Sequence, residues 1–168
     1  MQNNNHFFIN SISELHSYLK IRKPKHPLVR VINFDELEFK KSDDITMIVY
    51  NFYMISLKKN FDGKIKYGQQ YYDFEDGIMT FFAPNQIFSV EANSTQKVEG
   101  WMLVFHIDFI NSYNLIKYIK NYGFFSYTTN EALHLSYKEE NIVSSIMFNL
   151  FKEIDSIIDN FTQDLVVS

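Results

Sequence analysis

The sequence predicts a mainly β domain that ends in helices, an α+β fold. Short apolar segments separated by turn residues make up most of the chain before residue 107, and no helical pattern lies between them. This arrangement favours an antiparallel sandwich or barrel over a parallel sheet. After Asp108 the apolar residues recur at the spacing of helices. Because 46% of the 168 residues are hydrophobic and 17% are aromatic, the composition fits one domain with a crowded aromatic interior.

Residues 1–26 are predicted to form an N-terminal arm and a short helix. Ser11 and Glu14 have the spacing of a capping box, apolar residues follow at helical spacing, and the helix should end before Pro24. The basic run 20–26 is interpreted as a solvated helix end and linker, with phosphate binding as the alternative.

Residues 27–107 are predicted to form the β part. The segment 45–57 should bend into two strands, with Asn51 at the bulge or corner, and Pro84–Asn85 should reverse the chain between two strands. The expected strands lie at 28–34, within 45–57, and at 65–74, 77–83, 86–92 and 100–106.

Residues 108–168 are predicted to form a helical packing and dimerisation segment with two amphipathic helices. Asp108 is the expected N-cap of the first, which should end near Gly123. The second should begin at Ser136 with a capping box and run about six turns to Phe161. Its wide apolar stripe can cover the β part, pair with a copy of itself, or do both. The predicted dimer contacts are Ile146, Leu150, Ile154, Ile157 and Phe161.

The order of motifs along the chain resembles one family. Gly77 opens an apolar strand, Pro84–Asn85–Gln86 follows, and Trp101 leads to the run 105–109, FHIDF. This order resembles the N-terminal sensor domain of AraC-type transcription regulators, especially a group common in Bacteroidetes. The flanking segments 66–73, 123–127 and 130–136 fit as well, so the resemblance extends over nearly the whole chain from about Pro27.

The resemblance implies a cupin-like jelly-roll, an antiparallel β-barrel followed by helices. It also implies a homodimer and a small-molecule effector. DNA would be bound only through a C-terminal domain with helix-turn-helix motifs, which this sequence does not include. Whether the chain is part of a longer protein, whether the regulator activates or represses, and its DNA target stay open, as do the effector and the helix that forms the dimer interface.

Many cupins are metal enzymes, but the residues that would hold the metal are missing here. The segment 66–75 contains no His, and neither does 85–89 after the proline turn. His106 and Asp108 could share a strand face, but we interpret them as a strand-end histidine and a helix cap. The chain has no Cys and no nucleotide-binding or nucleophile motif. We therefore expect no metal, no cofactor and no catalytic residue.

An aromatic-lined barrel with a few polar groups is a typical small-molecule site, and Trp and Tyr rings stack well on sugars. We predict that a sugar-like effector contacts Arg30, Tyr53, Tyr72, Phe82 and Trp101. The alternative for each of these residues is packing in the core. Two other functions remain open: a cupin-fold sugar-modifying enzyme and a stand-alone sugar-binding module.

The charge and hydropathy of the sequence argue against two classes of partner, nucleic acid and membranes. The formal net charge is −4, so the chain by itself is a poor match for nucleic acid. The N-terminus lacks the pattern of a secretory signal, and no window is apolar over the length of a membrane span. The sequence therefore predicts a cytoplasmic protein without a membrane segment.

Overall fold

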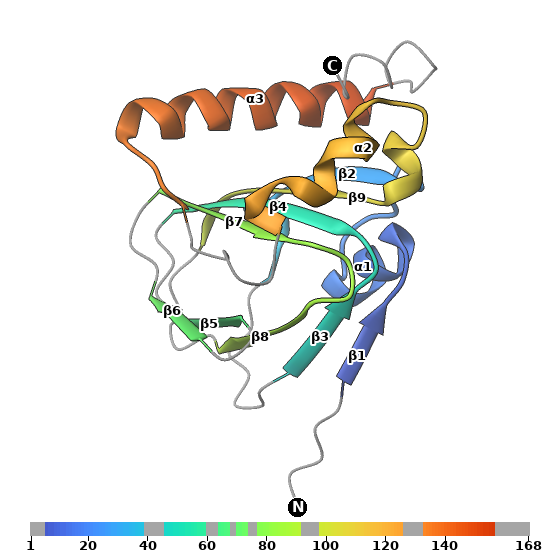
Figure 1. The fold of residues 1–168 in the computed structure, drawn as a ribbon, viewed down its shortest axis with the longest axis horizontal. Coiled ribbons are helices and arrows are strands. Elements are labelled where there is room, and N and C mark those ends of the chain that lie inside the picture. Colours follow the sequence, from blue (N-terminus) through green and yellow to red (C-terminus); the bar gives the residue numbers. More distant parts are fainter. Residues whose placement is uncertain are drawn as a thin grey trace, which may run out of the picture.

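The computed structural model describes residues 6–38, 46–59, 64–67, 70–73, 77–91, 98–125 and 133–156. The fold is mixed α+β, with mostly antiparallel strands in two sheets and a long helix near the C-terminal end of the described chain (Figure 1). The α+β class predicted from the sequence is thereby confirmed.

Sheet A and sheet B contain five strands each. Sheet A runs in the order β1 (His6–Ile9), β3 (Thr46–Tyr50), β8 (Ile87–Glu91), β5 (Lys64–Tyr67) and β6 (Gln70–Asp73). Sheet B runs in the order β10 (Leu133–His134), β7 (Ile78–Phe82), β4 (Tyr53–Lys59), β9 (Glu99–Phe105) and β2 (Val29–Asn33). All neighbours are antiparallel except β1 and β3, which are parallel.

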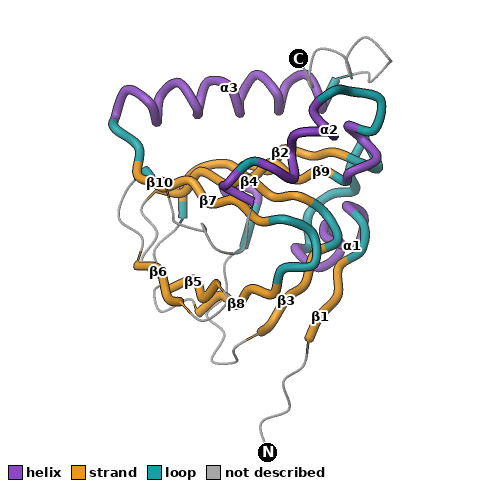
Figure 2. Tube along the Cα trace, viewed as in Figure 1, coloured by secondary structure: helices purple, strands orange, loops and turns teal. Residues whose placement is uncertain are grey.

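The closed barrel that the resemblance implied is not formed by the described strands. They build two separate sheets that face each other, with sheet B between sheet A and the C-terminal helices (Figure 2). No ladder joins β2, at one edge of sheet B, to an edge strand of sheet A within the described residues. The edges are therefore not paired into a ring there, which closure of a barrel requires.

One strand prediction differs in detail from the structure, and two turn predictions are confirmed. The predicted strand 65–74 is a hairpin of β5 and β6, and a turn-favouring glycine, Gly68, stands between them in the sequence. The predicted corner near Asn51 is confirmed, since β3 ends at Tyr50 and β4 begins at Tyr53. The Pro84–Asn85 turn is also confirmed, with Asn85 at φ 67° in the left-handed region.

The N-terminal segment contains a strand that was not predicted, β1, followed by the predicted helix α1 (Ile12–Leu19). Ser11 caps this helix by accepting a hydrogen bond from Glu14 N at 3.1 Å. The helix ends at Lys20, whose φ of 58° lies in the left-handed region. Ile12 and Leu15 are buried, so α1 anchors its apolar side in the protein interior.

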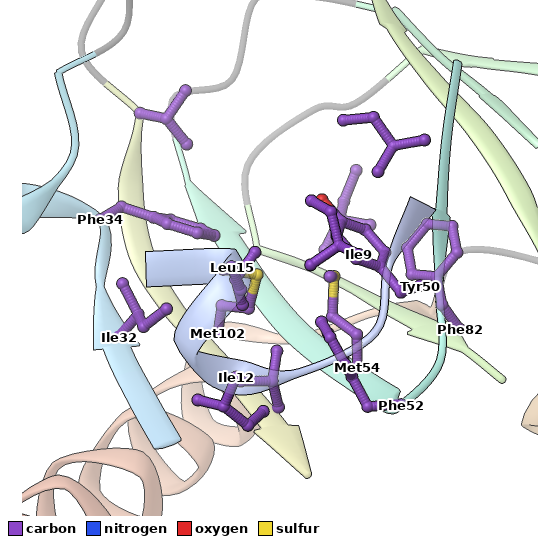
Figure 3. Close-up of a cluster of buried hydrophobic side chains, with 14 residues drawn as sticks. Ile9, Ile12, Leu15, Ile32, Phe34, Tyr50, Phe52, Met54, Phe82 and Met102 are labelled. Carbon is purple, nitrogen blue, oxygen red and sulfur yellow. The ribbon is translucent and has the colours of Figure 1, made fainter. Parts of the chain in front are cut away.

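The hydrophobic core between the two sheets is shown in Figure 3. Side chains from α1, from β3 and from four strands of sheet B meet here, so α1 occupies part of the space between the sheets. Phe52 is fully buried in this core. The labelled members are Ile9, Ile12, Leu15, Ile32, Phe34, Tyr50, Phe52, Met54, Phe82 and Met102.

The other side of sheet B is covered by the C-terminal part of the chain (Figure 1). The first covering segment is residues 107–125. The sequence predicted one helix over 109–123. Instead, the segment consists of the short helix α2 (Leu115–Tyr118) and three 3₁₀ turns, η2 (Ile107–Ile110), η3 (Ile119–Asn121) and η4 (Gly123–Phe125). A fourth such turn, η1 (Phe34–Glu36), follows β2.

The second covering segment is helix α3 (Tyr137–Asp155), 19 residues long. It begins at Ser136, as predicted, with a capping box: Ser136 Oγ accepts from Glu139 N at 3.4 Å, and Glu139 Oε2 accepts from Ser136 N at 2.8 Å. The helix ends at Asp155, because the C-cap residue Ser156 is extended, so the continuous helix predicted to Phe161 is too long. Residues 157–161 lie outside the described residues.

Candidate functional site

The side of sheet B that faces the helices, here called the helix face, is built by alternate residues of its central strands. Directly paired residues of antiparallel strands point to the same side. Tyr53 and Ile55 of β4 pair with Phe105 and Leu103 of β9, and these residues belong to the hydrophobic cluster under the helices. The intervening residues, such as Met54, point to the core between the sheets.

Helix α3 is seated on the helix face by aromatic and aliphatic contacts. Trp101 of β9 lies 5.6 Å from Phe151 and 6.2 Å from Phe148, measured between ring centroids. Met147 and Ile154, about two helical turns apart on the same side of α3, are 4% and 2% exposed. These contacts fix which side of α3 is turned toward the sheet.

Arg30 connects the core of the protein to the end of α3. Its backbone pairs with Val104, a residue of the core between the sheets, but β2 is an edge strand, so the side chain can reach around the edge. The guanidinium lies 5.3 Å from the centroid of the Phe151 ring, and Arg30 Nη1 donates to Asp155 Oδ1 at 3.1 Å. Arg30 Nη2 donates to Glu36 Oε2 at 2.9 Å.

Asp155, the last residue of α3, is contacted by two more cations. Arg22 Nη2 lies 2.5 Å from Asp155 Oδ2, and Lys25 donates to the Asp155 carbonyl oxygen. Burial raises the pKa of the Asp155 carboxyl, but the hydrogen bond from Arg22 and the neighbouring positive charges outweigh it, so the pKa lies below its usual value. We call Arg22, Lys25, Arg30, Glu36 and Asp155 the Asp155 cluster.

The basic run 20–26 is thus only in part the solvated linker that the sequence predicted. Arg22 and Lys25 remain about half exposed, but both hold Asp155. Cations near a helix C-terminus interact favourably with the helix dipole, and here the helix is α3, not α1. The N-terminal segment is therefore tied electrostatically to the end of the C-terminal helix.

A polar group lies on the core side of sheet B. Ser56 Oγ and Thr80 Oγ1 are buried and 2.6 Å apart across the β4–β7 ladder. Lys58 follows on the same side of β4, two residues after Ser56, and burial lowers the pKa of its ammonium group to about 7. Ser56, Thr80 and Lys58 thus place polar side chains on the core side of a sheet whose residues in the hydrophobic core are apolar.

The structure does not gather the five predicted effector contacts around one described cavity. Tyr53 and Trp101 point to the helix face, and Arg30 reaches the end of α3. Phe82 is buried in the core on the opposite side of sheet B. The side chain of Tyr72 lies outside the described part of the structure. Their role in binding stays a prediction.

The predicted dimer contacts are also divided. Ile146 is 53% exposed and Leu150 is half-buried, whereas Ile154 is 2% exposed and packs against the helix face of its own chain. Ile154 therefore does not present its side chain to a partner. Ile157 and Phe161 lie outside the described residues.

His106 and Asp108 form a helix cap, with the roles reversed from the prediction. His106 is the N-cap of η2, and its Nδ1 accepts a hydrogen bond from Asp108 N at 3.2 Å. Asp108 is exposed in the first turn. No group of three or more His, Asp or Glu among the described residues is placed to hold a metal ion. Within the same residues, no helix is both long and apolar enough for a membrane crossing.

No protein-family model and no curated protein matches this sequence.

Sequence reasoning missed the Asp155 cluster and the polar group on the core side of sheet B. Lys58 carried a signal, because Ser56 and Lys58 are alternate polar residues at the end of an apolar strand. Asp155 carried none, since its partners are at least 125 positions away in the sequence.

Proposed function

We propose that this chain is the ligand-sensing and dimerisation domain of an AraC-like transcriptional regulator. In this proposal the two facing sheets are a cupin-like jelly roll, and DNA is bound by a C-terminal helix-turn-helix domain outside this sequence. The order of the sequence motifs supports it, and so does the arrangement of two mostly antiparallel sheets followed by a long helix.

The observation that carries the proposal is an apolar stripe on α3 that sheet B leaves uncovered. Ile142 and Ile146 are 52% and 53% exposed, and Leu150, which is half-buried against the helix face, ends the row at the same four-residue spacing. Residues four apart lie on one side of a helix, so the three form one continuous strip. An exposed apolar strip of this kind marks an interaction surface.

A second copy of the chain is the occupant that fits this strip. Two α3 helices related by a two-fold axis would place the same strip of each against the other, as a self-complementary interface requires. The chain itself has a formal charge of −4, which suits a domain that presents a DNA-binding partner and does not grip phosphates.

The route from effector to dimer runs through sheet B. An effector between the sheets would contact the core side near Ser56, Thr80 and Lys58, whereas α3 packs on the opposite side of the same strands. The Asp155 cluster ties the end of α3 to β2 and to the N-terminal segment. A ligand that favours one seating of α3 would shift the population of dimers that present the DNA-binding domains correctly.

The test is the mass of the purified chain by light scattering. We expect a dimer at tens of micromolar, and we expect Ile146→Asp to convert it to a monomer, because a buried unpaired carboxylate opposes association. The control is Ile87→Asp, a matched change at an isoleucine that is 45% exposed on β8 of the other sheet. A monomeric wild-type chain, or a dimer that Ile146→Asp leaves intact, would contradict the proposal.

A further inference from the structure

A cavity of about 320 Å³ lies between the helix face of sheet B and residues 107–125. Five of its lining residues come from the sheet: Val29, Ile55, Phe81, Leu103 and Phe105. The other seven belong to the segment 109–125, which forms the roof. Ligand sites in proteins begin at about this volume.

Some residues of sheet B that line the cavity are partly exposed, although a tightly packed roof would bury them. Ile55 and Leu103 lie on β4 and β9, and Phe81 lies on β7; these are the three central strands of sheet B. Each side chain points under the roof, and yet each is only half-buried. Their core-side neighbours Met54, Phe82 and Val104 are buried. The difference indicates that the space under the roof is not filled by the described chain.

The lining chemistry decides which kind of molecule fits. All twelve lining residues are aliphatic or aromatic, none carries a charge, and the phenol of Tyr122 is the only side-chain polar group among them. Burying a charged or hydroxyl-rich molecule here would leave its polar groups without partners. A sugar, which the sequence analysis favoured, is therefore a poor match for this cavity.

The rim of the cavity is aromatic and accessible. Tyr122 and Phe124 line the cavity and are also 46% and 49% exposed. The Phe124 ring stacks on Phe81 at 4.9 Å between centroids, and Phe125 meets Phe81 edge-on at 5.9 Å. An apolar molecule that enters here would leave water and contact aromatic rings already at the rim.

The roof is suited to adjust around an occupant. It is built from turns closed by bonds such as Tyr113 N to Ile110 O, Ile116 N to Tyr113 O and Tyr122 N to Ile119 O. Each spans three residues, the pattern of 3₁₀ turns, whose hydrogen-bond geometry is poorer than that of an α-helix. An apolar void lowers stability because the side chains around it lack van der Waals contacts on one side. An occupant that fills the void supplies those contacts.

We propose that this cavity binds a small, uncharged, hydrophobic molecule. The inference rests on the function proposed above only for its role as effector, not for the binding itself. Nine of the twelve lining residues belong to the same cluster as Leu150, Phe151 and Ile154, so an occupant would contact neighbours of the residues that seat α3. The site thus offers a second route to the dimer helix, on the opposite side of sheet B from Ser56 and Thr80.

The probe for the test is N-phenylnaphthylamine, an uncharged dye whose fluorescence rises in apolar surroundings. We expect saturable binding with one site per chain. Its anionic analogue, anilinonaphthalene sulfonate, has the same rings and should bind at least about tenfold more weakly, because the cavity offers no cation. Equal affinity of the two dyes, or no saturable binding of the neutral dye, would overturn the inference.

The site is located by paired variants. Ile55→Phe places extra volume in the cavity and should weaken the neutral dye about tenfold or more, whereas the same change at exposed Ile87 should leave its affinity unchanged. Phe124→Ala removes a half-exposed ring at the rim that stacks on Phe81, so it keeps the test valid if Ile55→Phe does not fold. We expect it to weaken dye binding several-fold. A dye that both variants leave unaffected, or that Ile146→Asp displaces, would place binding elsewhere and refute the proposal.

Light scattering of the same samples separates this inference from the function proposed above. If the chain is a monomer but binds the neutral dye in the cavity lined by Ile55, the dimer proposal is wrong and the cavity proposal is supported. A dimer without dye binding would do the reverse.

Discussion

Arg30 Nη1 lies 3.1 Å from Asp155 Oδ1, and this ion pair joins edge strand β2 to the last residue of α3. The side chain of Arg30 is 3% exposed and that of Asp155 is 21% exposed, so the pair is largely shielded from water. Removing one partner of such a pair leaves a charge without compensation in a poorly solvated place. The attraction between the two charges is therefore the smaller contribution to stability. The larger one is that removing either partner would leave the other charge shielded from water and unpaired.

The first prediction concerns this pair. Asp155→Asn should lower the free energy of unfolding by about 2 kcal/mol, because Arg30 would keep only Glu36 as an anionic partner among the described residues. Asp108→Asn, at an exposed carboxylate, is the matched control and should change stability little. Urea unfolding measures both. Equal stability of the two variants would show that the Asp155 cluster is well solvated.

The second prediction separates the two sides of α3. Ile154→Ala should cost about 3 kcal/mol, since Ile154 is 2% exposed in the cluster under the helix. Ile142→Ala should cost less than about 0.5 kcal/mol in the monomer, because that side chain is 52% exposed. Chemical denaturation at low protein concentration avoids the contribution of a dimer. Similar losses for both would mean that α3 is not seated as described.

The sequence predicted the fold class because alternation and turn residues report local geometry. Helix α1 and the start of α3 were found for the same reason, since N-cap serines are local signals at Ser11 and Ser136. The predicted capping box forms at Ser136, whereas at Ser11 the Glu14 carboxylate accepts from Asn10 N instead. Pairing between distant segments has no such signal. The parallel ladder of β1 with β3 and the contacts of Asp155 were therefore beyond prediction.

The segment 107–125 shows a signal that was present but misinterpreted. Apolar residues recur at every third position, at 107, 110, 113, 116, 119, 122 and 125. A repeat of three matches the 3.0 residues per turn of a 3₁₀ helix better than the 3.6 of an α-helix. The hydrogen bonds, from Tyr113 N to Ile110 O and from Ile116 N to Tyr113 O, follow that repeat. Spacing thus indicated the turns that roof the cavity.

The sequence did not determine where the side chains of the proposed effector residues point, because the side to which a strand residue points depends on register. Tyr53 and Phe82 both looked like aromatic residues of a barrel strand. The β4–β7 ladder pairs Met54 with Phe82, so Phe82 points to the core side and Tyr53 to the helix face. A shift of one residue in strand register would turn each side chain to the other side of the sheet. The sequence of a single strand does not determine that register.

The third prediction is a pH dependence from Lys58. Burial lowers the pKa of this ammonium group from 10.5 to about 7 in the folded chain. Between these values the unfolded state binds a proton that the folded state has released, so the Lys58 contribution makes stability rise as pH rises from about 7. Below pH 7 both states are protonated, and this contribution no longer changes.

Lys58→Met should therefore flatten the rise in the free energy of unfolding between pH 7 and pH 9 relative to wild type. Lys120→Met, at an exposed lysine of η3, should keep the wild-type slope. Thermal or urea unfolding at a series of pH values measures the difference. Parallel curves for wild type and Lys58→Met would show that Lys58 titrates normally and is accessible to water.

The fourth prediction concerns Gly100, where β9 passes β4 too closely for a side chain. Its φ is +125°, and a Cβ placed on it would lie 2.1 Å from the carbonyl oxygen of Leu57. Backbone on both sides of the contact is held by the β4–β9 ladder, in which Gly100 pairs with Lys58. Gly100→Ala should therefore destabilise the chain by more than about 3 kcal/mol or prevent folding, as measured by urea unfolding and circular dichroism.

Gly77→Ala is the comparison for Gly100→Ala. Gly77 also has a positive φ, 72°, but its nearest neighbour is a side chain and not backbone. A Cβ there would meet Glu140 Oε2 at 2.8 Å, the far end of a flexible side chain that can move aside. We expect a loss of about 1–2 kcal/mol, mainly from the backbone conformation. If the alanine at 100 were tolerated as well as the alanine at 77, β9 could not approach β4 as closely as described. The helix face, which these two strands build, would then need a different register.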